Sequence, residues 1–266
     1  MSRRSLLRAA EGRPSFSRIM RMALSYLAVF VFTLLAVSSA LAIIPSGMTP
    51  ANLCALMFDT PFLHWLGNVA LIALTVSITG VALASMAGYA LSRFRFLGRS
   101  TTLNGLLVTQ LLPTTMLLLS LWLILITLGL INSYLGVILI YTATALPFCI
   151  WQLKGYYDTI PLSLEEAAAI EGCTRWQSFR LVVLPLAMPA LAITALFSFL
   201  IAWNEYVVAA LVLRDLDGFA LPLGLQMPNM NTQWGLYAAG ALLVSIPVVI
   251  LFLVVSRFLI ASAVED

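Results

Sequence analysis

The sequence has 266 residues, of which 62% are hydrophobic and only 9% are charged, and its mean hydropathy is +1.02. Soluble domains are about half apolar and about one quarter charged, so this composition excludes a water-soluble globule and predicts an integral membrane protein. The formal net charge of +3 comes from basic residues scattered between apolar runs, which excludes a nucleic-acid-binding face.

Apolar stretches long enough to cross a bilayer, which takes roughly 17–25 residues, recur along the whole chain. The first follows a basic lead and is too long for the apolar core of a signal peptide, so we interpret it as a retained span. Residues 62–68, with His64, Trp65 and Asn68, are expected at the outer membrane boundary ahead of the second span. The six predicted spans are 22–44, 69–92, 103–128, 134–153, 186–213 and 235–256.

The distribution of positive charge orients these spans. Of the 14 basic residues, only Arg214 falls in a segment that this topology places outside, and the other 13 fall in segments placed inside. Loops on the cytoplasmic side carry such an excess of Lys and Arg. The sequence therefore predicts an all-α integral membrane protein with six transmembrane helices, both termini cytoplasmic, and a single domain over residues 1–266.

Small residues recur at four-residue spacing in the second predicted span, at Gly80, Ala84 and Gly88. They lie along one stripe of a helix, where a second helix can approach closely. A chance arrangement in a helix rich in small residues would give the same pattern. The three cysteines are predicted to lie outside, within a span and inside, so they indicate no disulfide.

The most informative segment is the charged loop 161–185, which lies between the fourth and fifth predicted spans. Pro161, Ser163 and Glu166 are typical of a helix start, with Ser163 as the cap and Glu166 as its capping-box partner. The alanines that follow favour a continuing helix. Gly172 is predicted at the C′ position, just after the helix ends.

This loop resembles the EAA loop of ABC-importer permeases. In that family the loop forms a coupling helix, which seats in a cleft of the ATP-binding subunit and passes ATP-driven closure to the membrane domain. The resemblance implies an ATPase-coupling role here, whereas an ordinary cytoplasmic amphipathic loop is the alternative. The matching coupling residues are Glu166, Ala167, Ala168, Gly172, Leu184 and Pro185, with Val182 where the family more often has Ile.

Further runs resemble the binding-protein-dependent carbohydrate-uptake branch of these permeases, of the maltose-permease G-subunit type, and extend the likeness over nearly the whole chain. They include residues 89–93, 128–130, 146–148 and 203–206. The resemblance implies a type I importer permease fold in the inner membrane. It also implies a subunit that moves a sugar, of the oligosaccharide class, by alternating access driven by separate ATPase subunits. The particular sugar stays open, and a polyol cargo is an alternative.

The same resemblance implies the partners. They are a second, non-identical permease subunit, two ATP-binding subunits, an extracytoplasmic sugar-binding protein and membrane lipid, with no nucleic acid. ATP and Mg²⁺ would be bound by the partner ATPase, and no cofactor would be bound by this chain.

The residues needed for catalysis are sparse. The sequence has no G-x-x-x-x-G-K-[ST] phosphate loop, and it has a single lysine, Lys154, and a single histidine, His64. We therefore expect no ATP hydrolysis, no metal centre and no catalytic residue in this chain. An ion-coupled secondary transporter and a membrane enzyme are the alternative classes. Secondary transporters usually carry intramembrane carboxylates, discontinuous helices or inverted repeats, whereas the near-absence of histidine and the lack of clustered acids in the spans argue against an enzyme.

One acid, Glu205, lies within a predicted span, beside Asn204 near the outer end of the fifth span. Ionisable groups at such depth usually face protein or a water-filled cavity. Asn204 and Glu205 are therefore predicted to line or gate the translocation path. Simple hydration of Glu205 at the headgroup boundary is the alternative.

The outer loop before the last predicted span is rich in amides, each of which can donate and accept hydrogen bonds to sugar hydroxyls. In the related type this loop reaches into the sugar-binding protein, which implies the same contact here, and a plain polar loop is the alternative. The candidate contact residues are Gly224, Gln226, Asn229 and Asn231.

Overall fold

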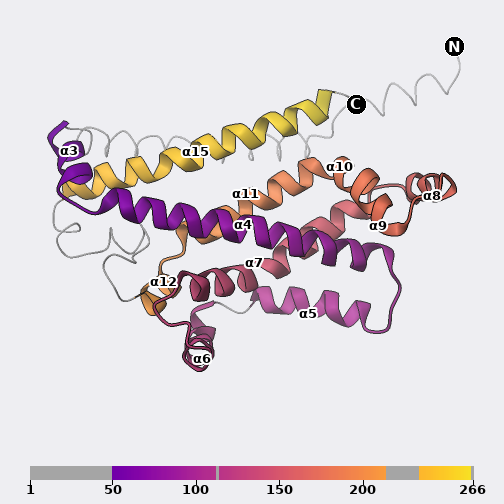
Figure 1. Ribbon diagram of the computed structural model, residues 1–266, viewed down its shortest axis with the longest axis horizontal. Coiled ribbons are helices and arrows are strands. Elements are labelled where there is room, and N and C mark those ends of the chain that lie inside the picture. Colours follow the sequence, from indigo (N-terminus) through magenta and orange to yellow (C-terminus); the bar gives the residue numbers. More distant parts are fainter. Residues whose placement is uncertain (1–49, 112–113, 214–233, 265–266) are drawn as a thin grey trace, which may run out of the picture.

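The computed structural model describes residues 50–111, 114–213 and 234–264, and in these ranges every regular element is a helix. Three long helices, α4 (Phe62–Arg93), α7 (Tyr134–Tyr157) and α15 (Trp234–Val264), run along the length of the molecule with α11 (Met188–Asn204) between them (Figure 1). The short helix α3 (Pro50–Phe58) lies beside one end of α15.

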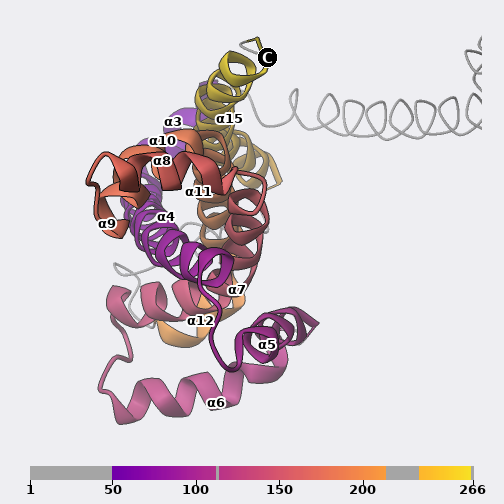
Figure 2. The ribbon, with the colours of Figure 1, turned by 90° about the vertical axis from the view of Figure 1, so that its right-hand side faces the viewer.

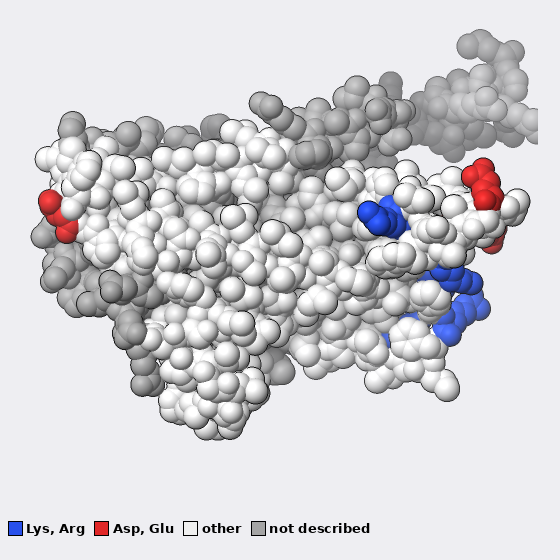
Figure 3. Space-filling view, viewed as in Figure 1, with Lys and Arg blue, Asp and Glu red and all other residues white. Residues whose placement is uncertain are grey.

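Several of these helices suit a membrane. In the described residues, α4, α7 and Gly235–Ser256 of α15 are long and apolar enough to cross one. The segments Arg175–Leu186 and Met188–Asn204 add a fourth span if this pair, bent by 78°, counts as one. On the face shown in Figure 3, the acidic and basic side chains lie toward the two ends and leave the middle free of charge, as a bilayer requires.

The third predicted span, 103–128, differs from the structure. It consists of two helices, α5 (Arg99–Leu111) and α6 (Thr114–Thr127), each shorter than a span. They form an arm outside the bundle of α4, α7 and α11 (Figure 2). Pro113 lies between the two helices, outside the described residues, and a proline favours a kink or a break because it lacks an N–H and its ring clashes with the preceding turn.

The fifth predicted span, 186–213, is also divided. The chain passes from α10 (Leu184–Leu186) into α11, leaves the helix at Glu205, and resumes as α12 (Val207–Val212). The first predicted span, 22–44, lies outside the described residues, so the six-span topology stays a prediction. The second and fourth predicted spans fall within α4 and α7, and α4 begins at Phe62, so residues 62–68 belong to the same helix.

Helix α4 is the centre of the bundle, and the predicted small-residue stripe is where its neighbours approach. A Cβ added at Gly88 would lie 3.2 Å from the backbone nitrogen of Lys154 in α7, and Ala84 is fully buried. Gly80 faces Ser198 of α11, with 3.6 Å between a Cβ added there and the serine Oγ. The stripe is therefore a packing surface for both α7 and α11.

Hydrogen bonds between helices supplement this packing. The Ser77 hydroxyl donates to the carbonyl of Ala195 at 2.8 Å, which ties α4 to α11. The Cys149 thiol and the Ser198 hydroxyl lie 3.1 Å apart and link α7 to α11. Among the residues that the structure describes, buried apolar side chains form two clusters, and the second, which includes Tyr89, Tyr157 and Phe179, lies beneath the charged loop.

Candidate functional site

The loop 161–185 folds into a chain of short helices at one end of the bundle (Figure 1). They are α8 (Leu162–Ile170), α9 (Arg175–Ser178), a π-helix (Phe179–Val183) and α10. A π-helical turn is rare and is frequently found at functional sites.

The start of α8 differs from the prediction. Pro161 occupies the N-cap position and no side chain caps the helix, so the predicted capping box of Ser163 and Glu166 is wrong. Ser163 is already the second residue of the helix, whereas a capping side chain belongs to the residue that precedes the first helical one. A capping box does form one helix later: Gln177 N–H donates to Thr174 Oγ1, and Thr174 N–H donates to Gln177 Oε1 at 2.8 Å.

The end of α8 confirms the predicted C′ position of Gly172. Its φ of 89° is in the left-handed region that favours glycine. Gly172 N–H donates to the Ala169 carbonyl at 3.1 Å, and Cys173 N–H donates to the Ala168 carbonyl at 3.0 Å. These two bonds are the Schellman pattern, with Gly172 at C′. A side chain at Gly172 would meet nothing within 4 Å, so the backbone conformation, rather than lack of space within this chain, requires glycine.

The two faces of α8 differ sharply. Glu165 and Ala168, three residues apart, turn toward the bundle, and Ala168 is buried. The opposite face is exposed and includes the isoleucine side chain at position 170, which is 88% exposed. The exposed face comprises Ser163, Glu166, Ala167 and Ile170, which share a stripe at helical spacing.

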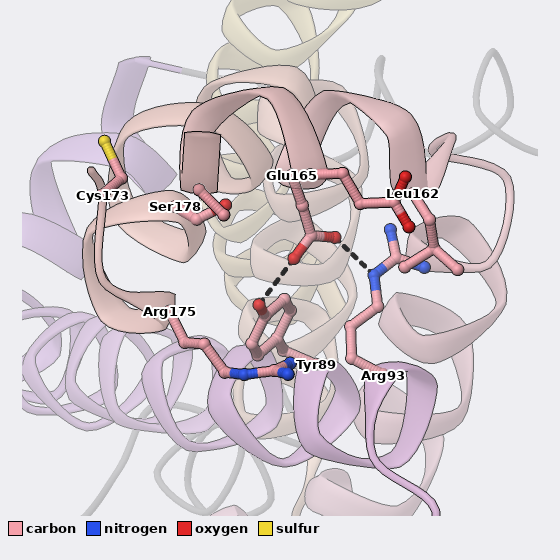
Figure 4. Close-up of a pocket in the computed structure, with 9 residues that line it drawn as sticks. Tyr89, Arg93, Leu162, Glu165, Cys173, Arg175 and Ser178 are labelled. Atoms are coloured by element: carbon pink, nitrogen blue, oxygen red, sulfur yellow. Dashed lines mark hydrogen bonds and ion pairs between the residues drawn. The ribbon is translucent and has the colours of Figure 1, made fainter. Parts of the chain in front are cut away.

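Glu165 joins α8 to the end of α4. Its carboxylate accepts a hydrogen bond from the Tyr89 hydroxyl at 2.7 Å and one from Arg93 Nε at 2.5 Å (Figure 4). The same guanidinium donates through Nη2 to the Ile160 carbonyl at 2.9 Å, just ahead of α8. Both charged side chains are largely buried, at 6% exposed for Arg93 and 12% for Glu165. Sequence reasoning chose Glu166 and missed Glu165, although Tyr89 and Arg93, one helical turn apart at the end of α4, were a usable signal.

Aromatic rings support this arrangement from below. The Tyr89 ring lies 4.5 Å from that of Phe179 in the π-helix and 6.2 Å from that of Tyr157 in α7, centroid to centroid. The Arg175 guanidinium stands over the Phe94 ring at 5.5 Å, which is a cation–π distance. A cavity of about 290 Å³ opens beside the carboxylate, lined among others by Tyr89, Arg93, Glu165, Glu166, Cys173 and Arg175.

A second polar contact links the ends of α4 and α7. The Ser92 hydroxyl donates to Asp158 at 2.6 Å, and Lys154 pairs with the same carboxylate at 2.5 Å. Burial raises the pKa of Asp158, but the hydrogen bonds from Lys154 and Ser92, with the charges of Lys154 and Arg99, outweigh burial and hold the pKa below its ordinary value. The carboxylate is therefore ionised at neutral pH.

The remaining predicted coupling residues, Leu184 and Pro185, lie after the π-helix, at the same end of the molecule as α8. Leu184 is half-buried against the second cluster and Pro185 is exposed, and both lie in α10, which leads into α11. They connect the loop to the next long helix rather than joining the exposed face of α8.

Asn204 and Glu205 lie at the far end of α11, away from α8 (Figure 1). The Glu205 carboxylate accepts hydrogen bonds from the N–H groups of Val207 at 3.0 Å and Val208 at 3.3 Å, so it caps the start of α12. The Glu205 carbonyl accepts from the Tyr141 hydroxyl at 3.1 Å, which anchors the break to α7. Asn204 is exposed and donates to the Leu200 carbonyl within its own helix.

The predicted binding-protein contacts Gly224, Gln226, Asn229 and Asn231 lie outside the described residues. Within the described ranges, no three His, Cys, Asp or Glu side chains are grouped so that they could hold a metal ion.

Comparison with known proteins identifies the class. Residues 80–260 match the family model described as "Binding-protein-dependent transport system inner membrane component". The chain therefore belongs to this family of multi-pass membrane transporter subunits, and it is a permease rather than a catalytic component.

Two relatives and one solved structure make the likeness more specific. The maltose/maltodextrin transport system permease protein MalG of Salmonella typhimurium is 41% identical over 75% of this chain and 70% of its own length. MalG of Escherichia coli K12 is 40% identical over the same shares. The fold also resembles a chain of a bacterial ABC transporter that imports the acidic polysaccharide alginate, with a TM-score of 0.73, 22% identity, and coverage of 92% of this chain and 99% of that one. The ABC-importer permease fold is thereby established.

Proposed function

We propose that this chain is the permease subunit of an ATP-driven, binding-protein-dependent importer of sugars, with oligosaccharides as the cargo class. The observation that carries the proposal is the construction of α8. Its exposed face, which includes Glu166, Ala167 and Ile170, projects from one end of the bundle, while its other face is held to α4 by a buried ion pair. Three large apolar side chains of this short helix, Leu162, Leu164 and Ile170, are exposed. A group of such side chains, unlike a single one, is typical of a surface that a partner protein covers.

The partner on that face is proposed to be an ATP-binding subunit, and ATP and Mg²⁺ would be bound there rather than by this chain. Closure of two such subunits would push α8, and alternating access would follow as the helices connected to it change their tilt. A second, non-identical permease subunit would form the other half of the path. The curated relatives are named for maltose and maltodextrin, which supports a sugar cargo but leaves open which sugar it is.

The proposed orientation places α8 and both termini in the cytoplasm, with six spans in the inner membrane. Asn204 and Glu205, at the opposite end of α11, would then lie toward the outer side, where the broken helix forms part of the path or its gate. Gly224, Gln226, Asn229 and Asn231 would contact the extracytoplasmic sugar-binding protein.

Reconstitution tests the proposal. The chain would be purified with a second permease and the ATPase subunits, inserted in liposomes with the binding protein, and assayed for uptake of labelled maltodextrins. We expect uptake that requires ATP and the binding protein. Uptake by this chain alone, driven by an ion gradient without ATP, would replace the proposal with an ion-coupled transporter.

The docking face can be tested separately. Replacing Ile170 with Glu should reduce the amount of ATPase subunit that co-purifies with the chain, because it introduces a charge into the centre of the proposed interface. Glu171→Gln is a matched control at the neighbouring position. Equal co-purification of ATPase with both variants would mean that the exposed face of α8 is not the docking surface.

A further inference from the structure

We infer that Glu165, Tyr89 and Arg93 form a clamp that makes α4 move together with α8. The clamp, in addition to the connectivity of the chain, transmits the movement of the ATP-binding subunits to the centre of the bundle. This inference rests on the proposed function. It assigns a positioning role to three residues, none of which is on the exposed face of α8.

Connectivity explains only part of the transmission. The chain links α8 directly to α7 through residues 158–161, and to α11 through α9, the π-helix and α10. Helix α4 is far away in sequence, since Tyr89 and Arg93 precede Glu165 by 76 and 72 residues. A force on α8 can therefore reach α4 indirectly, through α7 packed against it, but it reaches the end of α4 directly only through these side chains.

The geometry of these side chains suits a rigid connection. Glu165 is bound at both carboxylate oxygens, one by Tyr89 and the other by Arg93, which fixes the direction of the side chain as well as its position (Figure 4). Arg93 also holds the Ile160 carbonyl, so one guanidinium fixes both α8 and the turn that precedes it. Arginine presents several donors in a planar fork, which lysine cannot reproduce.

Burial makes the clamp hard to open by a small displacement. Both charged side chains are largely buried, so separating them would leave two charges without their ionic partner and with little access to water. The Tyr89 ring is simultaneously packed on Phe179, so the α4 end of the clamp is held on two sides. When α8 is pushed, moving α4 with it costs less than breaking these contacts.

The test uses the assembled complex and measures ATP hydrolysed per sugar transported. Glu165→Gln should raise this ratio on the order of tenfold, the scale expected for a lost hydrogen bond to a charged group. Tyr89→Phe, which removes one bond and keeps the ring, should raise the ratio by a smaller factor. Glu171→Gln, on the same loop but exposed, is the matched control and should match the wild type.

A second pair of variants separates the clamp from a general loss of folding. Arg93→Glu and Glu165→Arg should each uncouple the complex, and their combination should recover part of the coupling, because the pair is restored with its charges exchanged. Recovery in the double variant would support the clamp, since damage to folding would add rather than cancel. If Glu165→Gln does not assemble, Tyr89→Phe decides: a wild-type ratio in that variant overturns the inference.

An independent readout keeps this inference distinct from the proposed function. Amide hydrogen exchange of residues 162–170 in the purified chain should become about tenfold faster in Glu165→Gln and stay unchanged in Glu171→Gln. A wild-type complex that shows no coupling of ATP hydrolysis to uptake would overturn the proposed function alone. If the wild type and Glu165→Gln both couple ATP hydrolysis to uptake, and if amide exchange of residues 162–170 is unchanged in Glu165→Gln, the clamp alone is overturned.

Discussion

Gly88 of α4 lies directly against the backbone of Lys154 in α7, so that a Cβ added to this glycine would lie 3.2 Å from the backbone nitrogen of Lys154. The Ile150 carbonyl oxygen and the Leu153 Cβ, both at 3.3 Å, close the other sides. Because two of the three neighbours are backbone atoms of a helix, they cannot move aside cheaply. This contact sets how closely the two central helices approach.

Gly88→Ala is therefore expected to destabilise the protein by about 1–3 kcal/mol, the usual cost of overpacking. Gly80→Ala is the matched control on the same stripe, since its nearest neighbour is the Ser198 hydroxyl at an ordinary 3.6 Å. Thermal unfolding in detergent measures both. A melting temperature for Gly88→Ala equal to that of Gly80→Ala would show that α4 and α7 are not tightly opposed.

The capping box at the start of α9 gives a second prediction. Thr174→Ala removes the acceptor for Gln177 N–H and should cost about 1 kcal/mol, with faster amide exchange in residues 175–178. Ser163→Ala, at the position where sequence reasoning expected a cap, should have no such effect because Ser163 caps nothing. The opposite order of effects would mean that Ser163, not Thr174, caps a helix in this loop.

Gly172 gives a third prediction, based on its backbone rather than on its surroundings. Gly172→Ala should strain the left-handed turn by about 1–2 kcal/mol, whereas Gly172→Asn and Gly172→Asp should cost less because both side chains tolerate this conformation. We expect Gly172→Ala to reach the membrane but to couple ATP hydrolysis poorly to uptake. Gly155→Ala, at an open helical position, is the control. Full coupling in Gly172→Ala would contradict the role of this turn.

Glu205 gives a fourth prediction, which distinguishes capping from a role for its charge. Glu205→Gln keeps an oxygen that can accept from Val207 and Val208, so transport should stay near the wild-type rate. Glu205→Ala leaves both N–H groups without this acceptor and should lower stability by about 1 kcal/mol, and uptake with it. Equal loss of uptake in the two variants would instead indicate that the negative charge itself serves the translocation path.

Much of the architecture could be predicted because the relevant signals are local. The apolar segments within α4, α7 and α15 are recognised by hydropathy alone, and Gly172 was correctly placed because a helix end needs a left-handed residue within the same few positions. The division of 103–128 into α5 and α6 was harder, since a proline can either bend or interrupt a membrane helix. The neighbours of the helix decide which of these happens.

By itself, the amino-acid sequence determined that this protein is membrane-embedded and has a charged loop between two apolar segments, because hydropathy and charge are properties of contiguous residues, and the spacing of its motifs carried the resemblance to a permease family. Only the tertiary structure decided that Glu165, rather than Glu166, turns inward, and that Glu205 caps a broken helix. The physical reason is distance along the chain. Glu165 is held by groups 72 and 76 residues upstream, and a carboxylate's partner at that separation is set by how α4 and α8 are brought together.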